Sequence, residues 1–180
     1  IYNPEYQDGM EIISSYMATK FKLFVNCRNT VQIGTYSAKA SGVEIHDFLQ
    51  ENGEEVQTVS YSGMDDFKKQ IKDIIKKLRA EKVDTKDIAF LAPKKYSNSI
   101  LGKIGFEVNE LGENYEPDST LPRFATIQGF KGLDSKIVIL VDVDNILPEN
   151  FSKYIYIAGT RARTLLYVVG SEEFWKNHKQ

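Results

Sequence analysis

An uninterrupted aliphatic run at residues 137–141 constrains the fold of this chain more than any other feature. The run is the centre of a strand predicted over residues 136–143, and no polar residue alternates with the apolar ones. Such a strand is typical of a parallel sheet that is covered on both faces. Residues 164–169 predict a second strand of this kind, and residues 87–92, closed by Pro93, predict a shorter buried one.

Helical periodicity separates these strands. Residues 62–80 predict a helix with Ser62 as its N-cap, because apolar residues recur on one face at Phe67, Ile71, Ile74, Ile75 and Leu78. A second helix is predicted from about residue 151 to residue 163, and a closing helix begins at Ser171. Strands that alternate with helices indicate an α/β sandwich on a mainly parallel sheet. The polar stretches 41–55 and 112–122 are predicted to be long loops.

Composition limits the class of protein. The 180 residues predict one domain over 1–180, with residues 1–20 as a lead-in segment. A single cysteine excludes internal disulfides and thiolate metal sites. No apolar run is long enough for a membrane span, so we expect a cytoplasmic protein without a membrane partner. Because the chain begins at Ile1 rather than methionine, we expect it to be a fragment of a longer protein.

Three segments could carry chemistry. The first is an apolar strand over residues 23–25 that delivers Asn26 and Arg28 directly before a capping pair, Asn29 and Thr30. An arginine beside a helix N-terminus is well placed to meet a phosphate, because the guanidinium and the helix amides both favour anions. Taken alone, the segment fits a surface arginine in a loop better.

The second segment covers residues 124–134. Thr126 and Gln128 are predicted on one side of a short strand, and two glycines, one of them Gly132, then let a ligand approach the backbone closely. Lys131 adds a positive charge, and Asp134 offers an acceptor of the kind used for ribose hydroxyls. The pattern is not a P-loop, which occurs nowhere in the chain. Glycines in isolation more often mark a tight turn.

The third segment, residues 156–163, is the end of the predicted second helix and carries Arg161 and Arg163. Two positions apart on a helix, the two arginines lie on different faces, so at most one is expected to point into a cleft. A solvated basic helix end is the ordinary alternative.

In this order, the three segments resemble the C-terminal motor domain of UvrD/Rep-like superfamily 1 DNA helicases. Residues 23–30 resemble motif IV with its Asn-x-Arg-x-Thr core, residues 126–140 resemble motif V, and residues 156–163 resemble the Ala-x-Thr-Arg-Ala signature of motif VI. The resemblance implies a three-layer α/β/α RecA-like (P-loop NTPase-like) fold that lacks its own P-loop. Residues 34–121 fit the family only by their pattern of strands and helices.

The resemblance also implies roles. ATP with Mg²⁺ is expected in a cleft between this domain and an N-terminal RecA-like lobe of the same polypeptide, which carries the P-loop and the Mg²⁺ ligands. Arg28 and Arg161 would reach the γ-phosphate across that cleft as arginine fingers. Asn26, Gly132 and Asp134 would contact the nucleotide, and the isolated domain would be inactive.

Single-stranded or partly duplex DNA is the second partner that the resemblance implies. Thr126, Gln128 and Lys131 would contact the DNA, so that opening and closing of the two lobes moves the motor along a strand. The chain also departs from the family. Cys27 cannot stack on adenine as the usual aromatic residue does, and Gly159 stands where a larger residue is common and is expected to loosen its helix. No room remains for a large 2B-type insertion, so the chain indicates a compact variant.

Two other functions stay open. Asp142 and Asp144 follow the central strand at a spacing that would place both carboxylates on one side, where they could hold Mg²⁺ for phosphoryl or glycosyl transfer. Polar strand ends that cap a loop are the commoner explanation. The second alternative is a non-catalytic interaction module with a helicase-like fold. His46 and His178 have no second histidine nearby, so neither indicates a metal site or a catalytic triad.

Overall fold

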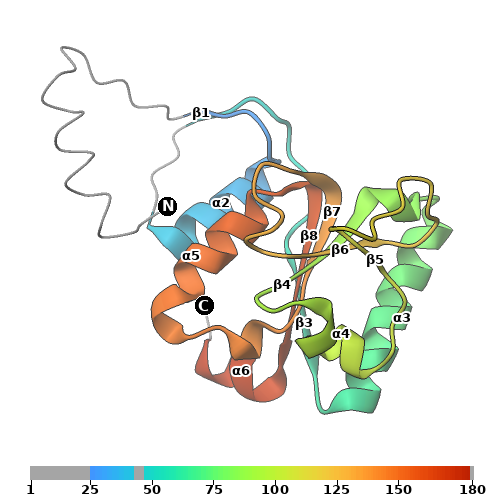
Figure 1. Cartoon of the computed structure of the whole chain (residues 1–180). Coiled ribbons are helices and arrows are strands. Elements are labelled where there is room, and N and C mark those ends of the chain that lie inside the picture. The colour runs from blue at the N-terminus through green and yellow to red at the C-terminus, as the bar shows by residue number, and fades with distance from the viewer. Residues whose placement is uncertain (1–24, 43–46, 179–180) are drawn as a thin grey trace, which may run out of the picture.

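The computed structural model describes residues 25–42 and 47–178, in which a six-stranded sheet forms the centre (Figure 1). The strand order is β3-β8-β7-β4-β6-β5, and every pairing within this sheet is parallel. These strands are β3 (Gln57–Tyr61), β4 (Ile88–Ala92), β5 (Asn109–Glu110), β6 (Arg123–Thr126), β7 (Ser135–Leu140) and β8 (Ala162–Ser171). Two short strands, β1 (Val25–Asn26) and β2 (Asp47–Phe48), pair with each other. The predicted parallel α/β architecture is confirmed.

Helices cover both faces of the sheet, as the aliphatic run requires. Successive residues of β7 alternate between the two cores: Ile137 and Ile139 belong to one hydrophobic cluster, and Val138 and Leu140 belong to the other. The first cluster lies under α3 (Met64–Ala80) and α4 (Ile100–Lys103), and the second lies under α2 (Val31–Ser41), α5 (Pro148–Gly159) and α6 (Glu172–Asn177). The order of layers is therefore helices, sheet, helices.

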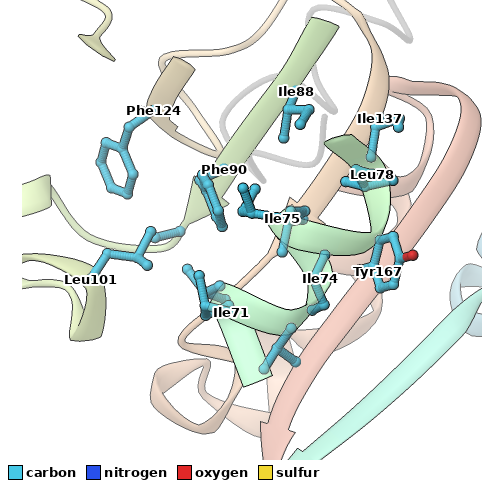
Figure 2. Packing of buried hydrophobic residues seen from close by; sticks show 14 of the residues in the cluster. Ile71, Ile74, Ile75, Leu78, Ile88, Phe90, Leu101, Phe124, Ile137 and Tyr167 are labelled. Carbon is cyan, nitrogen blue, oxygen red and sulfur yellow. The ribbon is translucent and has the colours of Figure 1, made fainter. Parts of the chain in front are cut away.

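The helix α3 packs through the apolar stripe that its sequence predicts. Figure 2 shows its isoleucines and Leu78 directed toward Phe90, Ile137 and Tyr167 of the sheet. The N-cap is Gly63 rather than the predicted Ser62, because the backbone turns into the helix with a φ of 99° at the glycine. Ser62 instead donates its backbone N–H to the carboxylate of Asp66 at 2.9 Å.

The other boundaries differ modestly from the predictions. The helix α5 begins at Pro148 and ends at Gly159, about three residues before the predicted limits, because β8 already starts at Ala162. The predicted cap of the closing helix is confirmed, since the Ser171 hydroxyl accepts from the Phe174 N–H at 3.0 Å. The stretch 112–122 has no helix or strand, as predicted. None of the helices in the described ranges has both the length and the hydropathy of a membrane span.

Gly159 is a contact point between helices rather than a source of looseness. A Cβ at this position would lie 2.1 Å from the Ser37 Oγ and 3.2 Å from the Ser37 Cβ, so the glycine allows α2 and α5 to pack closely. Both residues are buried. The expectation that Gly159 loosens its helix is therefore wrong, because close packing against α2 supports the end of α5.

Substitution of Gly159 tests this contact. We expect Gly159→Ala to lower the free energy of unfolding by about 1–3 kcal/mol, because the added methyl group forces α2 and α5 apart. Ser37→Gly removes the clashing side chain. In that background, Gly159→Ala should cause a much smaller loss of stability in urea unfolding. If Gly159→Ala lowers the free energy of unfolding equally with and without Ser37→Gly, Gly159 and Ser37 are not in contact.

Candidate functional site

Three charged residues from the three sequence segments meet at the edge of the sheet where β7 and β8 begin. Asp134 directly precedes β7 and Arg161 directly precedes β8, and the pairing of these neighbouring strands starts between Ser135 and Ala162. The Arg28 Nε lies 3.8 Å from the Asp134 Oδ2. We call Arg28, Asp134 and Arg161 the arginine cluster.

The Arg161 side chain is held by backbone carbonyls. Its Nη1 donates to the Leu133 carbonyl at 3.2 Å, and its Nε donates to the Ile157 carbonyl at 3.4 Å. Partial burial and the nearby positive charge of Arg28 lower the pKa of Arg161, against the opposing effect of Asp134. Two cations that repel each other at a partly buried position favour the binding of an anion.

Arg28 is less constrained than Arg161. Its side chain is 46% exposed, and Asp134 is its ion-pair partner at a long distance in exposed surroundings. Exposed ion pairs of this kind stabilise little, so Arg28 can exchange Asp134 for a ligand at small cost.

Asn26 shapes the turn that carries Arg28. Its Oδ1 accepts from the backbone N–H groups of Arg28 and Asn29, both at 3.0 Å, and its Nδ2 donates to the Asn29 Oδ1 at 2.9 Å. These bonds form an Asx turn. The structure thus gives the Asn26 side chain a role inside the turn, and its contact with a nucleotide stays a prediction.

Asn29 ties this turn to the segment that presents Arg161, a role that the sequence did not reveal. Its Nδ2 donates to the Gly159 carbonyl at 3.3 Å and to the Ala162 carbonyl at 2.5 Å, and the residue is 2% exposed. The sequence predicts Asn29 only as half of a capping pair. Thr30 is the N-cap of α2 by backbone position, although its hydroxyl makes no cap bond.

Thr126, the first of the residues predicted to contact DNA, lies apart from the arginine cluster. Thr126 ends β6 and therefore lies at the carboxyl edge of the sheet, whereas Asp134 and Arg161 lie at the amino edge. The loop after Thr126 returns across the sheet through Phe130, which is fully buried. Asp134 and Arg161 thus precede their strands, whereas Thr126 is the last residue of its strand.

Thr126 lines an open surface at the carboxyl edge, and the loop that leads from it to Asp134 is largely exposed. A groove of about 450 Å³ includes Thr126 and Gly129 together with Lys95 and Asn114. The Thr126 hydroxyl accepts from the Gly129 N–H at 2.9 Å and so shapes the turn after β6. Gln128, Lys131 and Gly132 are exposed, and Gly132 has a φ of 88°, a left-handed conformation that favours glycine.

Asp142 and Asp144 do not form a pair. Asp142 is buried and accepts from the Ile100 N–H, at 3.0 and 3.1 Å from its two oxygens, whereas Asp144 accepts from Ser171 and from the Tyr61 hydroxyl. The strand ends at Leu140, and Asp142 has a φ of 59°, so strand alternation does not extend to these residues. The prediction that both carboxylates lie on one side is wrong. Within residues 25–42 and 47–178, no group of three or more His, Cys, Asp or Glu side chains is arranged to hold a metal ion.

The remaining histidines do not change this description. His46 lies outside the described residues. His178 stacks on Phe174, with ring centroids 4.2 Å apart.

The burial of Asp142 can be tested by the pH dependence of the stability of the protein. Desolvation raises the pKa of Asp142 above its ordinary value of 3.8, although the Ile100 N–H opposes the shift. The folded state therefore binds the proton more tightly than the unfolded state, and stability falls as the pH rises from about 3.8 through the raised pKa. Asp142→Asn keeps an acceptor for Ile100 but cannot ionise.

We expect this fall in stability to be absent in Asp142→Asn when urea unfolding is followed between about pH 3.5 and 7. Asp73→Asn, an exposed change on α3, is the control and should keep the wild-type profile. An identical pH profile in Asp142→Asn and the wild type would show that Asp142 is not the group responsible.

Comparison with known proteins supports the fold. No family model and no curated protein matches the chain. A solved structure described as the C-terminal domain of a possible DNA helicase from Lactobacillus plantarum WCFS1 matches with a TM-score of 0.60 and 19% sequence identity. The match covers 80% of this chain and 86% of that one. The chain therefore has the α/β fold of that domain, a parallel sheet between helices that is consistent with a RecA-like domain.

Proposed function

We propose that this chain is the C-terminal motor lobe of an ATP-dependent DNA helicase or translocase of the UvrD/Rep-like superfamily 1 type. The observation that carries the proposal is the meeting of Arg28, Asp134 and Arg161 at one edge of the sheet. These residues come from three distant segments, and each segment resembles a different helicase motif. The fold shared with the Lactobacillus domain supports the same assignment.

The arginine cluster fits a triphosphate whose own binding site is elsewhere. Two guanidinium groups outweigh the single carboxylate of Asp134, so the cluster attracts an anion. The chain has no P-loop, so in this proposal the ATP and its Mg²⁺ are held by a separate N-terminal lobe. When bound there, the nucleotide would supply the phosphoryl group, and Arg161 would stabilise negative charge on that group.

Asp134 and Arg28 have separate parts in this proposal. Asp134 would accept from a ribose hydroxyl once Arg28 has turned toward phosphate. The weak pair between the two, at 3.8 Å in exposed surroundings, is compatible with that exchange. Gly132 would bring the backbone close to the nucleotide, since no side chain covers it.

The DNA contact is assigned to Thr126 at the carboxyl edge and to two residues of the loop that follows it, Gln128 and Lys131. Gln128 and Lys131 are exposed and can donate to phosphate oxygens, and Thr126 ends the strand beside them. Because Thr126 lies at the edge opposite the arginine cluster, a single strand could bind there while the cluster faces the nucleotide. Rotation of one lobe against the other would then connect hydrolysis to movement.

Two measurements test the proposal on the chain itself. Alone, the chain should show no ATP hydrolysis, with or without DNA, because the groups that hold the Mg²⁺-triphosphate are expected on the other lobe. It should bind a fluorescent oligo-dT, and Gln128→Ala with Lys131→Ala should weaken that binding about tenfold at low salt. The matched control is Lys82→Ala with Gln57→Ala, which lie outside the loop of Gln128 and Lys131.

Either of two results would contradict these assignments. DNA-stimulated turnover by the purified chain would show that a second lobe is unnecessary. If the variant with Gln128→Ala and Lys131→Ala, the control and the wild type bind DNA equally, Gln128 and Lys131 do not contact the DNA.

A further inference from the structure

A groove outside the arginine cluster and the carboxyl edge runs along α3. It has a volume of about 580 Å³ and lies between α3 and two segments, residues 104–107 and 121–122. Its apolar lining consists of Ile75, Ile104, Phe106, Leu121 and Pro122. We call this feature the α3 groove, and neither the proposed nucleotide contacts nor the proposed DNA contacts use it.

Positive charge is concentrated along one side of the α3 groove. Lys68, Lys72, Lys76 and Arg79 all line it and all are exposed. The lysines stand on successive turns of the helix, about 6 Å apart along its axis. Glu107 is the single carboxylate in the lining.

The four cations have no partner within the described part of the chain. The ion pairs of the neighbouring region involve other residues, such as Lys77 with Glu81 at 4.0 Å. No side-chain hydrogen bond or ion pair joins Lys68, Lys72, Lys76 or Arg79 to any residue that the structure describes. An apolar floor beside a row of unpaired cations is complementary to a ligand that is both acidic and apolar.

We propose that the α3 groove docks an extended segment of a partner protein in which acidic and apolar residues alternate. Residues two apart in an extended segment are separated by roughly 6.6 Å and point to the same side. This repeat matches the spacing of the lysines. The carboxylates of the segment can therefore contact the cations while its alternate apolar residues contact the apolar lining of the groove.

A protein segment fits the α3 groove better than a nucleic acid does. Proteins that bind single strands stack the bases on exposed aromatic faces. Phe106 is the one aromatic residue of the lining, and its ring packs edge-to-face against Phe90, with centroids 5.4 Å apart. The rest of the apolar lining is aliphatic or proline, which suits apolar side chains of a peptide.

The experiment measures binding of three fluorescent probes to the full chain at low salt. The probes are a 12-residue peptide of alternating glutamate and leucine, the same peptide with serine in place of leucine, and an oligo-dT. We expect the glutamate-leucine peptide to bind, and Lys72→Gln with Lys76→Gln to weaken it about tenfold. The control, Lys69→Gln with Lys77→Gln, changes the same charge on α3 outside the groove and should alter binding less than twofold.

The apolar contribution is tested separately. The glutamate-serine peptide should bind about tenfold more weakly than the glutamate-leucine peptide, and Leu121→Ser should reduce that difference. Circular dichroism confirms that the variants are folded. If the groove variant (Lys72→Gln with Lys76→Gln) and the control variant lose the same affinity for the peptide, the attraction is non-specific and the proposal is wrong.

Two further results would also overturn the proposal. Absence of peptide binding is one. The other is binding of oligo-dT that depends on Lys72 and Lys76 while the peptide fails to compete, which would make the groove a nucleic-acid site. This last result leaves the motor-lobe proposal standing, because that proposal depends on the arginine cluster and the carboxyl edge.

Discussion

Arg161→Ala is expected to lower the kcat of ATP hydrolysis about a thousandfold in a protein that joins this chain to the proposed N-terminal lobe. The reason is that Arg161 is already positioned by the carbonyls of Leu133 and Ile157, and its charge would act on the transferring phosphoryl group. Since the ATP itself would be held by the other lobe, its Kd should change by only a few-fold. Steady-state turnover and fluorescent-nucleotide titration measure the two quantities.

Arg163→Ala is the matched control for this variant. Arg163 lies two residues further on, is exposed on β8, and has no part in the arginine cluster. It should retain turnover within about twofold of the wild type. Unchanged turnover in Arg161→Ala would remove the arginine-finger assignment and favour the non-catalytic interaction module.

Asn29→Asp is expected to be the most destabilising of the single changes considered. The aspartate has the shape of the asparagine, but its carboxylate has no N–H to donate, so the carbonyls of Gly159 and Ala162 lose their buried partner. Unpaired buried polar groups and a buried charge together should lower the free energy of unfolding by roughly 2–4 kcal/mol. Urea unfolding at neutral pH measures the change.

The comparison variant is Asn114→Asp, an exposed change of the same chemistry in the loop 112–122. It should leave the free energy of unfolding within about 0.5 kcal/mol of the wild type. Equal stability of Asn29→Asp and Asn114→Asp would show that Asn29 does not hold the motif IV-like turn against α5.

The sequence predicted β4, β7 and β8 because these strands are buried on both faces of the sheet. The aliphatic residues of β7 and β8 pack into the hydrophobic clusters on both faces of the sheet, and α3 has a single apolar face. The short strands β2 and β5 were missed because each has two residues, too few to form a pattern. The strand β3 was also missed, although Val59 and Tyr61 alternate with polar residues in it.

The candidate site was only partly predictable. Arg28, Asp134 and Arg161 were identified through motif resemblance, and their meeting depends on the register of β7 against β8, which no local pattern shows. The roles of Asn29 and Gly159 come from contacts more than 100 residues apart in the sequence. The predicted Asp142 and Asp144 pair failed because the backbone leaves the strand at Leu140.

In the proposed motor lobe, Arg161 stabilises charge that develops on a nucleotide held by another lobe. The measurement is the affinity of a protein that joins this chain to the proposed N-terminal lobe. Its affinity for ADP with aluminium fluoride, an analogue of the transferring phosphoryl group, is compared with its affinity for ADP. We predict that Arg161→Ala weakens analogue binding at least a hundredfold and changes ADP binding only a few-fold. Equal affinities of the variant and the wild type for the analogue would contradict the claim.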